Sequence, residues 1–271
     1  MLLLLFPGVA HEGADIGVAL FMDSLFPYLL AYLILVSWLL KLTSRIPLSG
    51  RLNYLKIYIL SALGGFPTGA SIIAQLRERD ELSERQASIL LGICHCPSPL
   101  FVIGFVGQDL LGDVAFSVRY LILLHVFSLI LLFFLPIHSK KAKASAVIPN
   151  AFTSSVKESV PTVLVVGSTI IFFSTIYTVL YNLADGFLSS GQLLFLAAGL
   201  EMTNGLHAAH TLMDGDLLRV VIVLFLTMQS LSIHMQVAVI AKSASIPLST
   251  YVWMRAFYSI AIPFLYFLIF I

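Results

Sequence analysis

One carboxylate, Glu201, falls inside a long apolar stretch of the chain, with Thr203 and Asn204 beside it. A carboxylate at that depth is costly in a membrane, so it marks either a functional site or a group held by local hydrogen bonds. Desolvation favours its neutral form, so it could carry a proton near neutral pH, pair with a substrate donor or bind Na⁺. We predict that Glu201 is a binding residue; the alternative is a protonated carboxyl hydrogen-bonded to a hairpin backbone.

Glu201 belongs to one of four apolar segments that glycine, proline or clustered polar residues interrupt near the centre. The interruptions are Gly64–Gly69, Cys94–Pro99, Glu201–Gly205 and Gln229–His234. Proline removes a helix N–H and glycine weakens the helix, and in lipid the freed backbone groups are tolerated only where protein or a water-lined cavity supplies partners. We therefore predict broken helices whose ends form a site; the alternative is four kinks in packed helices.

We expect half-helix N-termini near Thr68, Ser98, Thr203 and Ser232. Half-helix ends supply backbone N–H and C=O groups with partial charges, which can bind small ions without a buried counter-charge. We place no basic residue inside the breaks, because Arg77, Arg119 and Arg255 are expected near helix ends. The predicted substrate-binding residues are Thr68, Gly69, Ser98, Glu201, Thr203, Asn204, Ser232, His234 and Gln236.

A metal site is conceivable but weakly indicated. His207 and His210 share a helix face at i and i+3, and Cys94 and Cys96 add soft ligands. Residues two apart on a helix face different sides, and the chain has no CxxC or HExxH spacing. We expect no metal, no other cofactor and no catalytic residue, so the chain is not predicted to be an enzyme.

The composition requires a membrane. The 271 residues are 59% hydrophobic and 11% charged, whereas soluble domains average about 45–50% and 25%. With a net charge of +1, the sequence does not predict the basic surface that binding to nucleic acid requires. Four segments read as unbroken membrane spans: 24–40, which reaches the required length with the apolar residues upstream from Ile16, and 115–136, 160–183 and 250–271.

Two halves of the chain share one pattern. A shift of 135 residues superposes Gly64 on Gly199 and Thr68 on Thr203, and the unbroken and broken segments follow in the same order. We predict a first inverted repeat over 1–137, a cytoplasmic linker over 138–157 and a second inverted repeat over 158–271.

The inversion follows from the loop charges. Lys/Arg-rich loops over 41–56 and 140–157 are placed in the cytoplasm, and the acidic loops around Asp109, Asp185 and Asp214 outside. Each half then has about three transmembrane helices and one re-entrant hairpin. The predicted fold is an all-α polytopic membrane protein with two inverted repeats and discontinuous helices at mid-membrane, which is typical of secondary transporters.

The motifs at the breaks also resemble a known family. Gly65–Ala70 and Ser98–Gly104, then Gly199–Gly205 and Leu231–Val237, are similar in sequence and order to the sporulation integral membrane proteins of the nucleoside-recognition, or Gate-domain, superfamily. The resemblance implies a protein of the cell membrane or forespore membrane of a spore-forming bacterium, and a family member is implicated in moving dipicolinate into the forespore.

We therefore expect a secondary transporter or facilitator of a small organic anion, with dipicolinate as the family-based substrate and H⁺ or Na⁺ as the coupling ion, if there is one. A nucleoside or related metabolite is the alternative substrate. The other open classes are an intramembrane enzyme using Glu201 with His234 or the cysteines, and a ligand sensor. The expected partners are the small-molecule substrate and the lipid bilayer; a homo-oligomer is left open.

Overall fold

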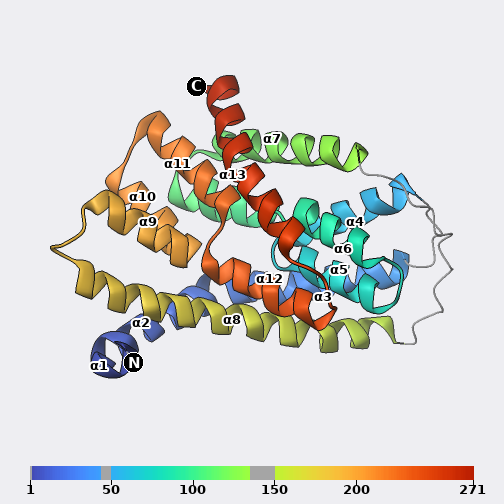
Figure 1. Ribbon diagram of the computed structural model, residues 1–271, viewed down its shortest axis with the longest axis horizontal. Helices are drawn as coiled ribbons and strands as arrows, with labels where there is room; N and C mark the ends of the chain where they lie inside the picture. Colours follow the sequence, from blue (N-terminus) through green and yellow to red (C-terminus); the bar gives the residue numbers. More distant parts are fainter. Residues whose placement is uncertain (1, 44–49, 135–149) are drawn as a thin grey trace. The chain divides into compact units, whose positions relative to one another are not determined.

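The computed structural model describes residues 2–43, 50–134 and 150–271, and within them every regular element is a helix (Figure 1). The first half contains α1 Leu2–Leu5, α2 Pro7–Ala19, η1 Leu20–Leu25, α3 Phe26–Thr43, α4 Arg51–Gly64, α5 Thr68–Glu78, α6 Glu84–Cys94, η2 Phe101–Leu110 and α7 Val114–Phe133. The second half contains α8 Ala151–Ala184, α9 Ser190–Leu200, α10 Met202–Leu212, α11 Gly215–Met228, α12 Leu231–Ser243 and α13 Ser249–Phe270. The all-α prediction is confirmed.

Four helical stretches in the described residues are long and apolar enough to cross a membrane. Three of them, α7, α8 and α13, match predicted unbroken spans to within a few residues at most ends, although α8 begins nine residues earlier, at Ala151. The fourth combines α11 and α12 over 215–243. The predicted span 24–40 lies in the helical run of η1 and α3.

The four interruptions are confirmed as helix ends, although each of them is shorter than predicted. Residues 65–67 separate α4 from α5, and residues 95–98 lie outside helix after α6. In the second half, Glu201 alone separates α9 from α10, and residues 229–230 separate α11 from α12.

The chain divides into two compact units, each built from segments distant in sequence. Unit 1 contains Met1–Tyr28, Val163–Gln236 and Ser259–Ile271, and unit 2 contains Leu29–Thr162 and Val237–Tyr258. Residues 138–149 of the predicted linker lie outside the described residues; the rest of it, Asn150 to Lys157, lies at and within the start of α8.

In unit 1, two glycines one turn apart bring α2 against α8. A Cβ on Gly13 would lie 2.8 Å from the Cα of Thr175, and one on Gly17 would lie 2.7 Å from the Cα of Ile171. This Gly-x-x-x-Gly spacing lets two helix backbones approach closely, which is a common mode of packing in membranes.

In unit 2, the core is an apolar cluster centred on α4, α5 and α6. Ile57, Ile73 and Leu91 are fully buried within it. This packing fixes the two helix breaks of the first half, because α4, α5 and α6 lead into or out of them.

Candidate functional site

Three charged side chains are buried in the part of the chain that the structure describes: Lys41, Glu201 and Arg255. A buried charge requires partners, because its desolvation is expensive. Glu201 lies at a helix break, and Arg255 contacts another break through its side chain, so the candidate site is built around these breaks.

The break between α4 and α5 places Thr68 at the first position of α5, where the sequence predicted a helix N-terminus. Its hydroxyl donates to the carbonyl of Gly64 at 3.2 Å, so the side chain closes the broken turn. Gly69 is needed for close packing, since a Cβ there would lie 2.8 Å from the carbonyl oxygen of Cys94 at the end of α6.

The break after α6 meets the break after α4. Gly65 contacts the backbone of Ser98, and its positive φ of 69° favours glycine. The Ser98 hydroxyl accepts a hydrogen bond from the N–H of Phe101 at 3.2 Å, as a helix N-cap does. The structure therefore brings Thr68, Gly69 and Ser98 into one region of unit 2.

Arg255 also reaches this region, although no basic residue was expected inside the breaks. It is the seventh residue of α13 and is 4% exposed. Its guanidinium donates to the carbonyl of His95 at 2.9 Å and to the carbonyl of Gly92. These carbonyls belong to the last turn of α6 and its cap, so Arg255 stabilises the negative end of the broken helix.

Aromatic and hydroxyl groups surround the guanidinium. The Arg255 Cζ atom lies 4.5 Å from the centroid of the Tyr258 ring, and the Tyr258 hydroxyl is 2.8 Å from the hydroxyl of Ser128. Tyr120, within electrostatic range of Arg255, is fully buried, and its hydroxyl has no hydrogen-bond partner among the described residues. This cluster could not be predicted from the sequence, because its members come from α7 and α13 and share no local motif.

The break between α9 and α10 is organised by Glu201. It is 3% exposed and acts as the N-cap of α10, accepting from the N–H of Asn204 at 3.0 Å and from the Thr203 hydroxyl at 3.5 Å. The side-chain nitrogen of Asn204 is buried and has no partner in the described residues. The structure thus brings Glu201, Thr203 and Asn204 together.

The break between α11 and α12 holds the remaining predicted residues. Ser232 and Gln236 are buried, and the Gln236 amide donates to Thr169 of α8 at 3.1 Å and to Ser232 at 3.5 Å. His234 was expected inside the break, but it lies within α12, where its N–H donates to the carbonyl of Ser230 at 3.0 Å. The helix resumes earlier because the Ser230 hydroxyl accepts from the N–H of Ile233 at 3.4 Å.

The described residues contain no group of three or more His, Cys, Asp or Glu side chains that could hold a metal ion. The break after α6 and the break between α9 and α10 have hydrogen-bond donors in apolar surroundings. Such donors interact strongly with negative charge. No family model, no curated protein and no solved structure matches the chain, so this geometry carries the functional argument.

Proposed function

We propose that the protein is a secondary transporter or facilitator of a small organic anion, with dipicolinate as the substrate that the family resemblance suggests. The observation that carries this proposal is the set of four helix breaks inside apolar segments. Broken helices with polar ends at membrane depth are maintained where they line a substrate site. The resemblance also suggests a forespore membrane as the location.

The polarity of the buried groups supports an anion as the substrate. Tyr120 and Asn204 each leave a buried donor without a partner in the described residues, and Arg255 brings a buried positive charge to the first-half breaks. Carboxylates accept hydrogen bonds from such groups, and charge-assisted bonds are about twice as strong as neutral ones. We propose that a substrate carboxylate binds beside Tyr120 and Arg255 in unit 2.

The order of helices supports two inverted repeats. Shifted by 135 residues, α4 overlaps α9, α5 overlaps α10, α6 overlaps α11 and α7 overlaps α13. Inversion requires the turn before α6 and the turn before α9 to face opposite sides of the membrane. A cysteine at exposed Glu78 should then be shielded from an impermeant thiol reagent in intact cells, while one at exposed Ser190 should react. Equal labelling at the two positions would contradict inversion. The two native cysteines are buried, so the reagent reports on the introduced cysteines.

Counterflow of labelled dipicolinate in reconstituted vesicles tests the function directly. Accumulation driven by unlabelled dipicolinate on the opposite side is expected, and labelled uridine serves as the nucleoside comparison. Turnover of the substrate without intact vesicles would instead indicate an enzyme. Binding without counterflow would indicate a sensor.

Variants at the first-half breaks test the site. Thr68→Val and Ser98→Ala should each weaken dipicolinate binding by roughly tenfold, because each removes a hydroxyl at a half-helix end. Thr211→Val is the matched control, since the exposed Thr211 hydroxyl bonds only to a carbonyl one turn earlier in its own helix in the described contacts. Unchanged affinity in both break variants would place the anion elsewhere.

A further inference from the structure

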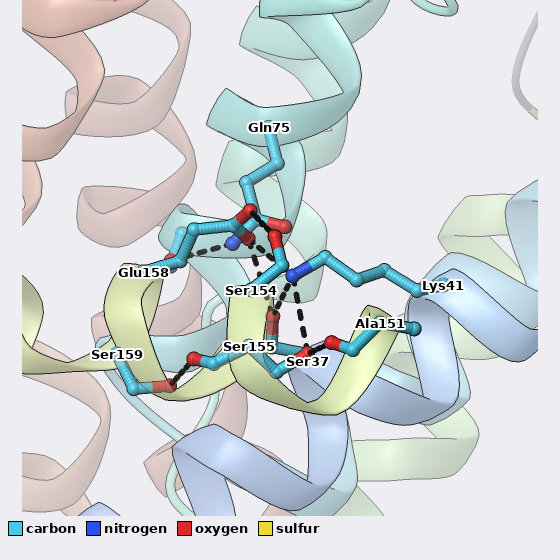
Figure 2. A network of polar contacts seen from close by, with 9 residues as sticks. Ser37, Lys41, Gln75, Ala151, Ser154, Ser155, Glu158 and Ser159 are labelled. Atoms are coloured by element: carbon cyan, nitrogen blue, oxygen red, sulfur yellow. Dashed lines mark hydrogen bonds and ion pairs between the residues drawn. The ribbon is translucent and has the colours of Figure 1, made fainter. Parts of the chain in front are cut away.

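Lys41, the third buried charge, lies in the last turn of α3 and is bound by oxygen atoms of α3 and α8 (Figure 2). Its ammonium donates to a carboxylate oxygen of Glu158 at 2.8 Å, to the Ser155 hydroxyl at 3.1 Å and to the Ser37 hydroxyl at 3.3 Å. The charge pattern places Lys41 in a cytoplasmic loop, but its side chain is only 1% exposed. An ammonium has three donors, and these three oxygens match that number.

The serine protons are directed away from the ammonium. Ser155 donates its own proton to the carbonyl of Ala151 at 2.8 Å, and Ser154 donates to the second carboxylate oxygen of Glu158 at 2.8 Å. The Ser37 hydroxyl is 3.4 Å from the Glu158 oxygen that binds Lys41 and donates to it. The hydroxyl lone pairs are thus left to face the positive charge, as they do around a bound cation.

Gln75 of α5 adds a further oxygen. Figure 2 shows its side chain pointing toward this cluster. Its Oε1 atom is buried and has no hydrogen-bond partner in the described residues. Gln75 therefore offers one more oxygen acceptor next to the oxygens that bind Lys41.

A lysine ammonium is a compact point charge, so an oxygen cage that holds it resembles the site of an alkali cation. Glu158 balances a single positive charge, and the hydroxyls complete the shell without adding charge. If the lysine side chain were truncated, the carboxylate and the hydroxyls would remain in place and would lack a cation.

We propose that the Lys41 ammonium fills a monovalent-cation site formed by Glu158, Ser155 and Ser37, and that this tethered cation replaces a coupling ion. The second part rests on the transport function proposed above: the cycle then requires neither Na⁺ nor K⁺. Protons remain available for coupling at Glu201.

The site is tested on purified protein, without any assay of transport. Lys41→Ala should unfold at a higher temperature in NaCl or KCl than in choline chloride of equal ionic strength, by about 3 °C or more at salt concentrations well above the dissociation constant. The added substitution Glu158→Gln should abolish this difference. Lys157→Ala, which truncates the exposed neighbouring lysine, should behave as wild type.

Equal unfolding temperatures of Lys41→Ala in all three salts would overturn the site. A sodium- or potassium-specific rise in the wild-type unfolding temperature would also overturn the site, because the Lys41 ammonium already occupies it. This measurement on the wild type can be made even if Lys41→Ala fails to fold. Sodium- or potassium-dependent counterflow by the wild type would overturn the ion-replacement role alone. A complete absence of counterflow would count against the transport function and leave the salt measurements to decide the site.

Discussion

Helices α6 and α9 begin alike and end in opposite ways. Each has 11 residues and starts at a Ser-x-x-Gln capping box, formed by Ser83 with Gln86 and by Ser189 with Gln192. At the break that follows α6, the cation of Arg255 binds the C-terminal carbonyls. At the break that follows α9, the carboxyl of Glu201 caps the next helix by accepting from the N–H of Asn204. A broken helix can therefore be stabilised from either side of the gap, by the polar group that complements the exposed helix end.

The largest expected effect is at the break after α6, where Arg255 binds the C-terminal carbonyls. Arg255→Met leaves the carbonyls of Gly92 and His95 without the donors that bind them, so it should cost about 3–5 kcal/mol of unfolding free energy. Arg255→Lys should recover part of the loss, since an ammonium lacks the planar fork that spans two carbonyls. Thermal unfolding in detergent measures both, and Arg119→Met on an exposed face of α7 is the control. Similar losses at Arg119 and Arg255 would contradict the capping role.

The next effect concerns how tightly α9 and α10, the two helices that meet at Glu201, pack against each other. A Cβ on Gly205 would collide with the backbone of Ala198 in α9, so Gly205→Ala should cost about 1–3 kcal/mol. Gly199→Ala, in the same hairpin, meets nothing within 4 Å and should be neutral or stabilising by about 0.5–1 kcal/mol. Denaturant unfolding of the two variants tests this contrast, and an equal loss in both would refute it.

A smaller effect is expected from Glu201, the N-cap of α10. Glu201→Ala removes the acceptor for the N–H of Asn204 and should cost about 1–2 kcal/mol. Glu201→Gln keeps an oxygen that can accept this hydrogen bond, so less stability should be lost. If Glu201 also carries the coupling proton, Glu201→Gln should abolish pH-driven dipicolinate uptake but retain exchange. Unchanged pH dependence would leave Glu201 only its structural role.

The smallest effects should come from the two helix starts. Ser83→Ala and Ser189→Ala each remove one capping hydroxyl, so each should cost about 1 kcal/mol. Thermal unfolding of both variants tests whether the starts are equivalent. A clearly larger loss at one of them would show that α6 and α9 differ along their whole length and not only at their breaks.

The breaks could be predicted from the sequence because glycine, proline and polar residues within an apolar run are a local signal. Thr68 begins α5 as expected, and Glu201 lies at the break where it was placed. The partners of the buried cations could not be predicted. Arg255 binds carbonyls 160 and 163 residues away, and Lys41 binds a carboxylate 117 residues away, so neither contact leaves a trace in local spacing.

The alignment of the two halves carries less packing information than its shared glycines indicate. Gly64 and Gly199 superpose under the shift of 135 residues, but a Cβ on Gly64 would collide with the side chain of Thr68, whereas Gly199 has open space around it. The same residue type therefore serves close contact in one half and not in the other. Only the three-dimensional structure distinguishes the two glycines, because the fold determines which neighbour, if any, excludes a Cβ.

The length of α8 connects the protein to the thickness of its membrane. Its 34 residues extend over roughly 50 Å at 1.5 Å per residue, whereas the hydrocarbon layer is about 30 Å thick. The helix must tilt or project from the layer, and the predicted span 160–183 leaves the turn that carries Glu158 outside it. A thicker bilayer would draw this carboxylate toward the acyl chains and strengthen its attraction to Lys41. The contact between α3 and α8 should therefore tighten or loosen with the lipid composition around it.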